Sequence, residues 1–121
     1  MDTENPYFPQ NIHKAYHAHI YFDENSLSQV EGICAQAGDE FGLKVGRIHQ
    51  KLVGPHTRWS VQITFGQRDF ERFIPWLDAE RGKLDVLVHG MTGDDYRDHT
   101  DHAYWLGQPV ELDLSIFSPA P

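Results

Sequence analysis

The sequence has a single cysteine and no long apolar run. Cys34 has no partner for an intramolecular disulfide and lies in a helical pattern, so it is expected to be a structural residue. No stretch approaches the roughly 20 apolar residues of a membrane span, and the polar, acidic N-terminus differs from a signal peptide. We therefore expect a soluble cytoplasmic protein with no membrane partner.

Positive charge is also scarce. Lysine and arginine number 10 against 18 acidic residues, which gives a formal net charge of −8 with the eight histidines neutral. Such a chain repels polyanions and has no basic stripe, so nucleic acid is not an expected partner. A length of 121 residues fits one domain over 1–121, with an irregular arm at 1–13 that contains two prolines.

The periodicity of the apolar residues predicts alternating strands and helices. Side chains at helical spacing predict a helix over 27–41, ending at Gly42, and a second helix that begins near 70 and stops at Gly82. Pro75 predicts a kink or a late start in that second helix. Ranges with strand character are 15–22, 45–53, 59–65, 84–88 and 110–116.

This order, βαββαβ followed by one more strand, is typical of the ferredoxin-like fold. The prediction is an α+β domain with an antiparallel sheet, two helices on one sheet face and an extra C-terminal strand. In this topology the first strand is central, with the third and fourth as its neighbours. The uncovered face remains available for function or for dimerisation.

His17 and His19 are two residues apart in the first strand, so both imidazoles point to one sheet face. Ala18, Ile20 and Phe22 supply the apolar set for the other face, which places the histidines on the uncovered side. His89, at the end of the fourth strand, is expected to join them there. Several neutral imidazoles on one face are suitable ligands for a metal ion.

Further histidines lie in the loops. His56 is in the turn at 54–57, and His99 and His102 have i, i+3 spacing in an Asp-rich loop, so one helical turn would place both on a common side. His13 and His49 are weaker candidates for the site. His49 lies on an edge strand, and the sequence does not determine the register of that strand. The aspartates of that loop, Asp94, Asp95, Asp98 and Asp101, are expected to be solvated.

Several ordered motifs resemble the DOPA 4,5-dioxygenase family of small extradiol ring-cleaving enzymes. They are His17-Ala18-His19-Ile20-Tyr21-Phe22, Val53-Gly54-Pro55-His56 followed by Trp59, Leu87-Val88-His89, Thr92-Gly93-Asp94, and Asp98-His99 leading to Trp105-Leu106-Gly107. The family usually has proline where this chain has Thr57 and Gly90. The resemblance implies a ferredoxin-like fold, a homodimer, and iron(II)-dependent insertion of both atoms of O2 beside the diol of a catechol.

On this basis the expected metal ligands are His17, His19 and His89, for Fe(II) or for zinc or another divalent ion. The site is all-histidine or is completed by a loop carboxylate. His56 is expected as a ligand or as the base that deprotonates the catechol, and His102 as the acid. The aromatic residues expected to line the slot for a small aromatic diol are Tyr21, Trp59 and Tyr104.

Two other functions remain compatible with the sequence. Imidazole ligands also suit zinc, which would make the protein a metal-dependent hydrolase. Alternatively, the polar sheet face belongs to a non-catalytic dimeric module that binds a small ligand.

Overall fold

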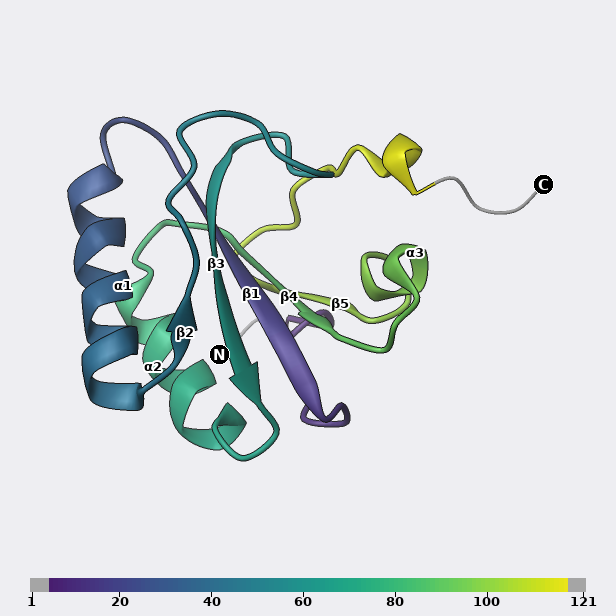
Figure 1. Cartoon of the computed structure of the whole chain (residues 1–121), viewed down its shortest axis with the longest axis horizontal. Helices are drawn as coiled ribbons and strands as arrows, with labels where there is room; N and C mark the ends of the chain where they lie inside the picture. Colours follow the sequence, from purple (N-terminus) through teal and green to yellow (C-terminus); the bar gives the residue numbers. More distant parts are fainter. Residues whose placement is uncertain (1–4, 118–121) are drawn as a thin grey trace.

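The computed structural model describes residues 5–117. Five antiparallel strands form one sheet in the order β2-β3-β1-β4-β5, with α1 and α2 on one side of it and α3 with the C-terminal segment on the other (Figure 1). The elements are β1 (Ala15–Phe22), α1 (Leu27–Phe41), β2 (Lys44–Val45), β3 (Trp59–Gly66), α2 (Phe70–Glu80), β4 (Val86–Gly90), α3 (Asp95–Asp98), β5 (Ala103–Leu106) and a 3-10 turn (Leu114–Ile116). The predicted α+β architecture and the central first strand are confirmed.

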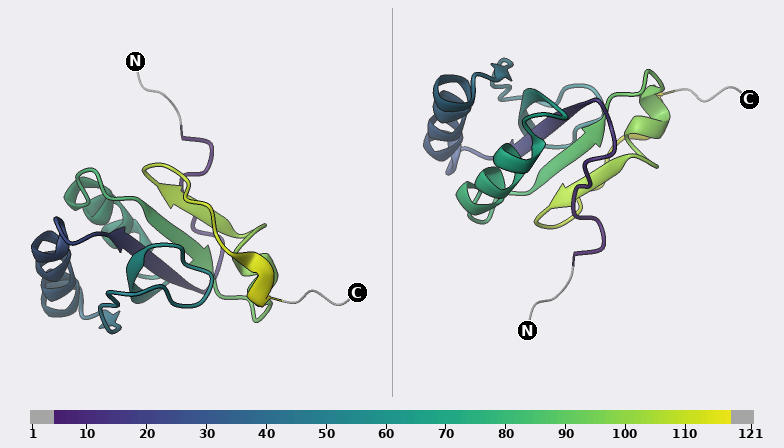
Figure 2. Two further views of the ribbon diagram at one scale, coloured as in Figure 1. Left: turned by 90° about the horizontal axis from the view of Figure 1, so that it is seen from above. Right: turned by 90° about the horizontal axis from the view of Figure 1, so that it is seen from below.

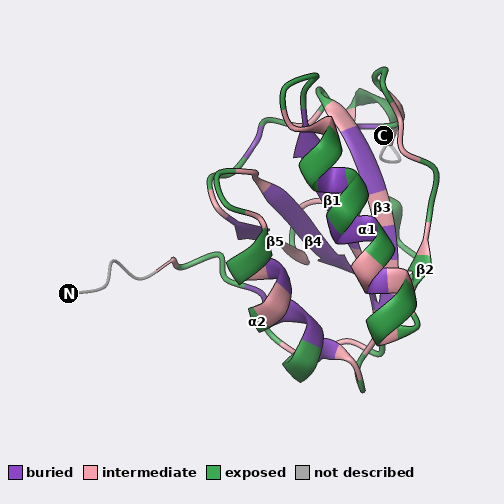
Figure 3. Cartoon of the chain, turned by 90° about the vertical axis from the view of Figure 1, so that its left-hand side faces the viewer, coloured by how far each residue is buried: buried purple, intermediate pink, exposed green. Residues whose placement is uncertain are grey.

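The alternation in β1 decides which residues face the helices. Tyr16, Ala18, Ile20 and Phe22 are all buried in the core beneath α1 and α2, and their cross-strand partners include Ile63 of β3. Figure 3, drawn with these helices in front of the sheet, shows the buried stripes along their inner sides. Burying a large aliphatic or aromatic side chain stabilises the fold by about 1.5–3 kcal/mol, so this layer fixes the register of β1.

Both predicted helices form, with differences at their ends. Gly42 ends α1 in the left-handed conformation, at φ 66°, as its position predicts. Ser26 does not cap α1 with its side chain; its hydroxyl instead bonds to Asp23 within the preceding turn. Pro75 lies inside α2, which begins at Phe70. The prediction of a late start was therefore wrong.

The strand predicted at 45–53 was too long. Val45 lies opposite Ile63, and an isolated bridge joins His49 to Ser60. The chain therefore advances four residues from Val45 to His49 while β3 advances three between the partner residues. This one-residue offset is a bulge, which interrupts the ladder after two residues. Beyond β2 the segment is bonded to β3 through the Gly46 N–H, which donates to the Gln62 carbonyl (2.7 Å), and through that bridge.

The strand predicted at 110–116 does not form in the described part of the chain. The extra strand is β5, which pairs with β4 and lies earlier in the sequence. Val110 and Leu112 instead pack on a second cluster, formed by Tyr21, Leu87 and Trp105 on the open sheet face. Their alternation therefore reflects packing onto that face and not strand pairing.

The N-terminal arm lies along β5, as both views in Figure 2 show. The Asn5 side-chain amide donates to the Trp105 carbonyl (2.7 Å), and the Trp105 N–H donates to the Tyr7 carbonyl (2.7 Å). Residues 5–13 contain no helix or strand, and residues 1–4 of the expected arm lie outside the described residues. Between residues 5 and 117, no helix has the length and apolar character needed to cross a membrane.

Candidate metal and catalytic site

Three histidines meet on the open face of the sheet. His17 of β1 lies directly opposite His89 of β4, and His19 lies one side-chain position further along β1 on the same face. One ligand nitrogen from each of the three can be chosen so that all lie within 4.8 Å of one another. The predicted convergence is confirmed, because the antiparallel register brings residues about 70 positions apart into contact.

Burial keeps these imidazoles neutral. The pKa of His89 is lowered to about 3, mainly by burial and then by its histidine neighbours, although the hydrogen bond to Gly90 opposes the shift. Burial also lowers the pKa of His17, and it lowers that of His19 well below the usual value, with further lowering from the surrounding histidines. Only a neutral imidazole has a lone pair free for a metal ion.

A hydrogen bond selects the tautomer of His89. Its Nδ1–H donates to the Gly90 carbonyl over 3.0 Å, so its Nε2 carries the lone pair and points to Nε2 of His19, also 3.0 Å away. Two nitrogens bound to one ion at about 2.1 Å each and at right angles would be separated by about 3.0 Å. The spacing of this pair therefore fits two ligands of one first-row divalent metal ion, and imidazole is a suitable ligand for such an ion.

One of the four loop aspartates is not solvated as expected. Asp98 is buried, and its carboxylate accepts hydrogen bonds from the Thr92 N–H and hydroxyl. It lines the same cavity as the three histidines, and its charge partly counters the lowered pKa of His17 and His89. Asp98 is thus the buried carboxylate of the cavity lining, to which the exposed Asp95 adds a second one.

His56 lies beside the cluster and is oriented by Tyr21. Its ring centroid is 4.2 Å from that of His19, and its Nδ1 is 2.7 Å from the buried Tyr21 hydroxyl. That hydroxyl has no other partner among the described residues. The tautomer in which the Tyr21 O–H donates to Nδ1 satisfies this buried donor, and in that tautomer His56 carries its proton on Nε2. Burial lowers the pKa of His56 to about 4 and raises that of Tyr21.

His99 enters the site from the end of α3. Its ring centroid is 4.2 Å from that of His89, and it stacks on Phe117 at 4.7 Å. The His99 Nδ1–H donates to the Asp95 carbonyl over 2.8 Å, which leaves its Nε2 as an acceptor. His56 and His99 therefore present opposite functions, a donor and an acceptor, beside the same cluster.

His102 is not brought to this cavity. The helix ends at Asp98, so His99 and His102 do not share one helical face. His102 packs on His13 with ring centroids 4.8 Å apart, and the His13 Nε2 lies 3.1 Å from the Tyr104 hydroxyl. The geometry gives no support to the predicted role of His102 as the acid, which stays a prediction.

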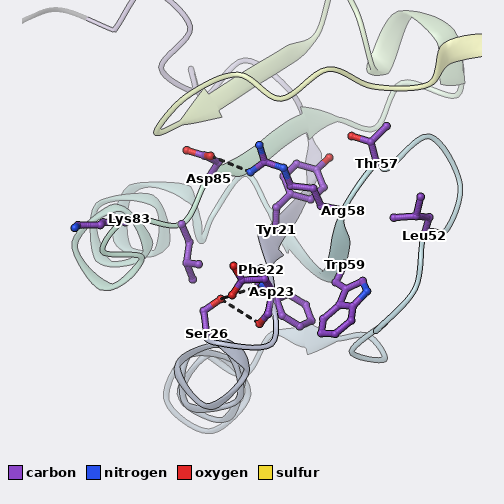
Figure 4. Close-up of a pocket in the computed structure, with 11 residues that line it drawn as sticks. Tyr21, Phe22, Asp23, Ser26, Leu52, Thr57, Arg58, Trp59, Lys83 and Asp85 are labelled. Carbon is purple, nitrogen blue, oxygen red and sulfur yellow. Dashed lines mark hydrogen bonds and ion pairs between the residues drawn. The ribbon is translucent and has the colours of Figure 1, made fainter.

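The three predicted aromatic residues lie outside the cavity lining. Tyr104 pairs with the core residue Val88 and so faces the helices, and Trp59 packs on Phe22 with centroids 5.9 Å apart. Tyr21 and Trp59 line a different cavity of about 490 Å³, beside Arg58, which pairs with Asp85 (Figure 4). The contact between Tyr21 and the cavity lining is its hydrogen bond to His56.

The histidine cavity has a volume of about 570 Å³. Five histidines line it, and its apolar walls come mainly from the 53–56 turn and from the C-terminal segment: Val53, Pro55, Met91, Ile116 and Phe117. The Asp113 N–H donates to the Pro55 carbonyl (2.8 Å), which ties these two walls together. Phe117 was not among the predicted site residues, because residues 110–116 were predicted to form a strand.

Comparison with known proteins identifies a family for this chain. The model of the Dopa 4,5-dioxygenase family matches residues 16–116. A DOPA 4,5-dioxygenase from Amanita muscaria is 28% identical over 111 residues, and an uncharacterized 21.2 kDa protein from Botryotinia fuckeliana is 33% identical over 117 residues. These matches cover 84% and 87% of this chain but only 49% and 64% of those relatives.

A solved structure is also similar. The crystal structure of a candidate dioxygenase from Nostoc punctiforme superposes with a TM-score of 0.81 at 35% sequence identity. The match covers 84% of this chain and 89% of that one. The similarity therefore extends over most of both chains.

Proposed function

Because this chain belongs to the Dopa 4,5-dioxygenase family, we propose that it is a non-haem iron(II) extradiol dioxygenase that cleaves the ring of a catechol. The observation that carries the proposal is the cluster of His17, His19 and His89 in a cavity of about 570 Å³. Cavities of this size suit small organic ligands. In the overall reaction one ring C–C bond next to the diol breaks, and both atoms of O2 enter the product.

The three clustered histidines would hold the metal through neutral imidazole nitrogens. When bound, iron(II) would supply the redox chemistry that joins a catechol to O2, at positions that three protein ligands leave open. The hydrogen bond from His89 to Gly90 fixes one ligand ring before metal arrives. Asp98 lies near enough to lower the net positive charge of a loaded site.

The two other histidines supply proton transfer. The free Nε2 of His99 would accept a hydroxyl proton from the catechol, and the Nε2–H of His56, held by Tyr21, would donate a proton to oxygen. A positioned acid or base of this kind typically contributes about 10² to 10⁴ in rate. The apolar walls, including Phe117, would exclude water and stack on the ring.

The test is metal analysis and oxygen uptake on protein purified without oxygen. We expect about one equivalent of iron and O2 consumption with simple catechols. Replacing His89 by alanine should abolish iron binding, whereas His49→Ala, a histidine outside the cavity lining, should retain it. His99→Ala should keep iron and slow turnover.

Two results would overturn the proposal. A three-histidine set is also a zinc donor set, so activity that requires zinc and consumes no O2 would identify a hydrolase. Ligand binding with equal strength in metal-free and metal-loaded protein, without turnover, would identify a non-catalytic binding module. Size-exclusion chromatography with light scattering would test the expected homodimer.

A further inference from the structure

A row of polar side chains extends from the histidine cluster to the edge of the sheet. His17 lies opposite Thr64 of β3, and Thr64 lies opposite Lys44 of β2. Directly opposed residues share one face of a sheet, and Val45, which follows Lys44, packs on the helix side. Lys44 and Thr64 therefore lie on the open face, in the same row as His17.

Gln62 connects this row to the cavity. It lies opposite His19 in the pairing of β1 with β3, and it lines the histidine cavity. On its other side is Gly46, whose N–H donates to the Gln62 carbonyl over 2.7 Å. Because Gly46 has no side chain, position 46 places nothing on the open face between the cavity and the edge of the sheet.

The polar ends of Lys44, Thr64 and Gln62 have no partner among residues 5–117. The Lys44 ammonium forms no ion pair there, and neither the Thr64 hydroxyl nor the Gln62 amide forms a hydrogen bond with a described residue. All three groups can donate hydrogen bonds. A strip with three such donors, one of them charged, suits a carboxylate, which accepts hydrogen bonds and carries negative charge.

The Lys44 charge acts on the histidine cluster. The pKa of His17 is lowered first by burial and then by His99, and the Lys44 ammonium lowers it further. From β2 to β1 is a distance of two strand spacings, or about 10 Å, and the flexible four-carbon stem of lysine lets its ammonium approach over Thr64. A ring at the histidines with a short acidic side chain would therefore bring its carboxylate to Lys44.

The acidic residues of the cavity lie on its other side. Asp95 and Asp98 belong to α3, which follows β4, whereas Lys44 belongs to β2 at the far edge of the sheet (Figure 1). Asp98 already accepts hydrogen bonds from Thr92. A carboxylate that points toward β2 therefore lies away from both aspartates.

On the premise of the proposed function, we infer that the strip formed by Lys44, Thr64 and Gln62 binds a carboxylate on the side chain of the catechol and so determines the specificity of the site. The ring would lie at the three histidines, and its side chain would extend across β3 toward β2. Lys44 is exposed, so its ion pair with the substrate should be weak. We expect a preference of about threefold in kcat/KM for a carboxylate over a neutral group of the same shape.

Two catechols of nearly the same shape test the inference. Their substituents are 2-carboxyethyl, which is negatively charged, and 2-carbamoylethyl, which is neutral. We expect kcat/KM to be about threefold higher for the acid, and the difference should shrink at high salt because the pair is exposed. Dissociation constants measured by calorimetry on iron-loaded protein without oxygen should follow the same order, which gives a readout independent of turnover.

Variants assign the preference to this strip. Lys44→Gln should remove it, Lys44→Glu should reverse it, and Lys44→Arg, which keeps the charge, should retain it. Thr64→Val should lower the ratio of acid to amide without reversing it. Lys83→Gln removes the same charge from an exposed lysine that lines the other cavity and should leave the ratio unchanged. Iron content and circular dichroism would verify that each variant is loaded and folded.

The possible failures are distinguishable. A ratio that Lys44→Glu does not change, even where both rates fall, would show that Lys44 acts through His17 and not on the substrate. That result, or a kcat/KM for the amide that equals or exceeds that for the acid, would overturn the inference and leave the dioxygenase proposal intact. No oxygen uptake with either catechol by iron-loaded protein would overturn the proposed function itself.

Discussion

The buried histidines should make the metal-free protein sensitive to mild acid. Burial lowers the pKa of His56 to about 4 and that of His89 to about 3, whereas both are near 6.5 in an unfolded chain. Below pH 6.5 the unfolded state therefore binds more protons than the native state, so the free energy of unfolding falls as the pH falls. The two histidines make their full contribution to the free energy of unfolding only above pH 6.5.

The magnitude follows from the same values. At pH 5 each of the two histidines lowers the free energy of unfolding by about 2 kcal/mol relative to its value at neutral pH. Together they lower it by about 4 kcal/mol. Because whole domains are stable by about 5–15 kcal/mol, this loss is a large fraction of the total. The lowered pKa of His19 adds to it in the same direction. Most carboxylates titrate below this window.

Urea titrations of chelator-treated protein between pH 7.5 and 5 would measure the effect. His56→Gln keeps an acceptor for Tyr21 but removes one titrating group, so it should reduce the loss by about 2 kcal/mol. Saturating metal should flatten the profile, since it binds the neutral rings. A loss below about 1 kcal/mol in the metal-free protein without substitutions over this range would refute the idea that the cluster is buried in the neutral form.

Three further results are expected. Tyr21→Phe removes the hydrogen bond that fixes His56, so it should retain metal and lower kcat by about tenfold or more; equal kcat in parent and variant would contradict that role. A Cβ at Gly90 would lie 2.6 Å from the His13 ring, so Gly90→Ala should lower the free energy of unfolding by about 1–3 kcal/mol, and adding His13→Ala should restore much of it in a thermal melt. Phe117→Ala opens one cavity wall and should raise KM for catechols more than it lowers kcat; steady-state kinetics that show only a kcat effect would argue against stacking by Phe117.

The sequence was sufficient to predict the core of the fold and the cluster of three histidines on the open sheet face. Strict alternation in Ala15–Phe22 determines which side chains face the helices, and the topology then makes that strand central. Once those two facts are known, His17, His19 and His89 must share one face. The prediction that these histidines share one face did not depend on the conformation of any loop.

The loop residues could not be ranked in the same way. His99 caps the end of α3, whereas His102 lies beyond it and is not brought to the cavity. The periodicity of the sequence does not define where a helix of a single turn ends. Trp59 is not a loop residue but the first residue of β3, where its pairing with Phe22 turns it to the helix side. The segment at 110–116 has the alternation of a strand, yet β5 already occupies the outer edge next to β4.

The two ends of the sheet limit how copies of this chain can associate. One outer strand, β2, has only two residues, begins with a lysine and is followed by a bulge, while the other, β5, has backbone groups of Trp105 bonded to the N-terminal arm. Short, charged or covered edges resist pairing with a further strand. A dimer of this protein is therefore expected to join through faces or loops, and a continuous ten-stranded sheet across two subunits is disfavoured.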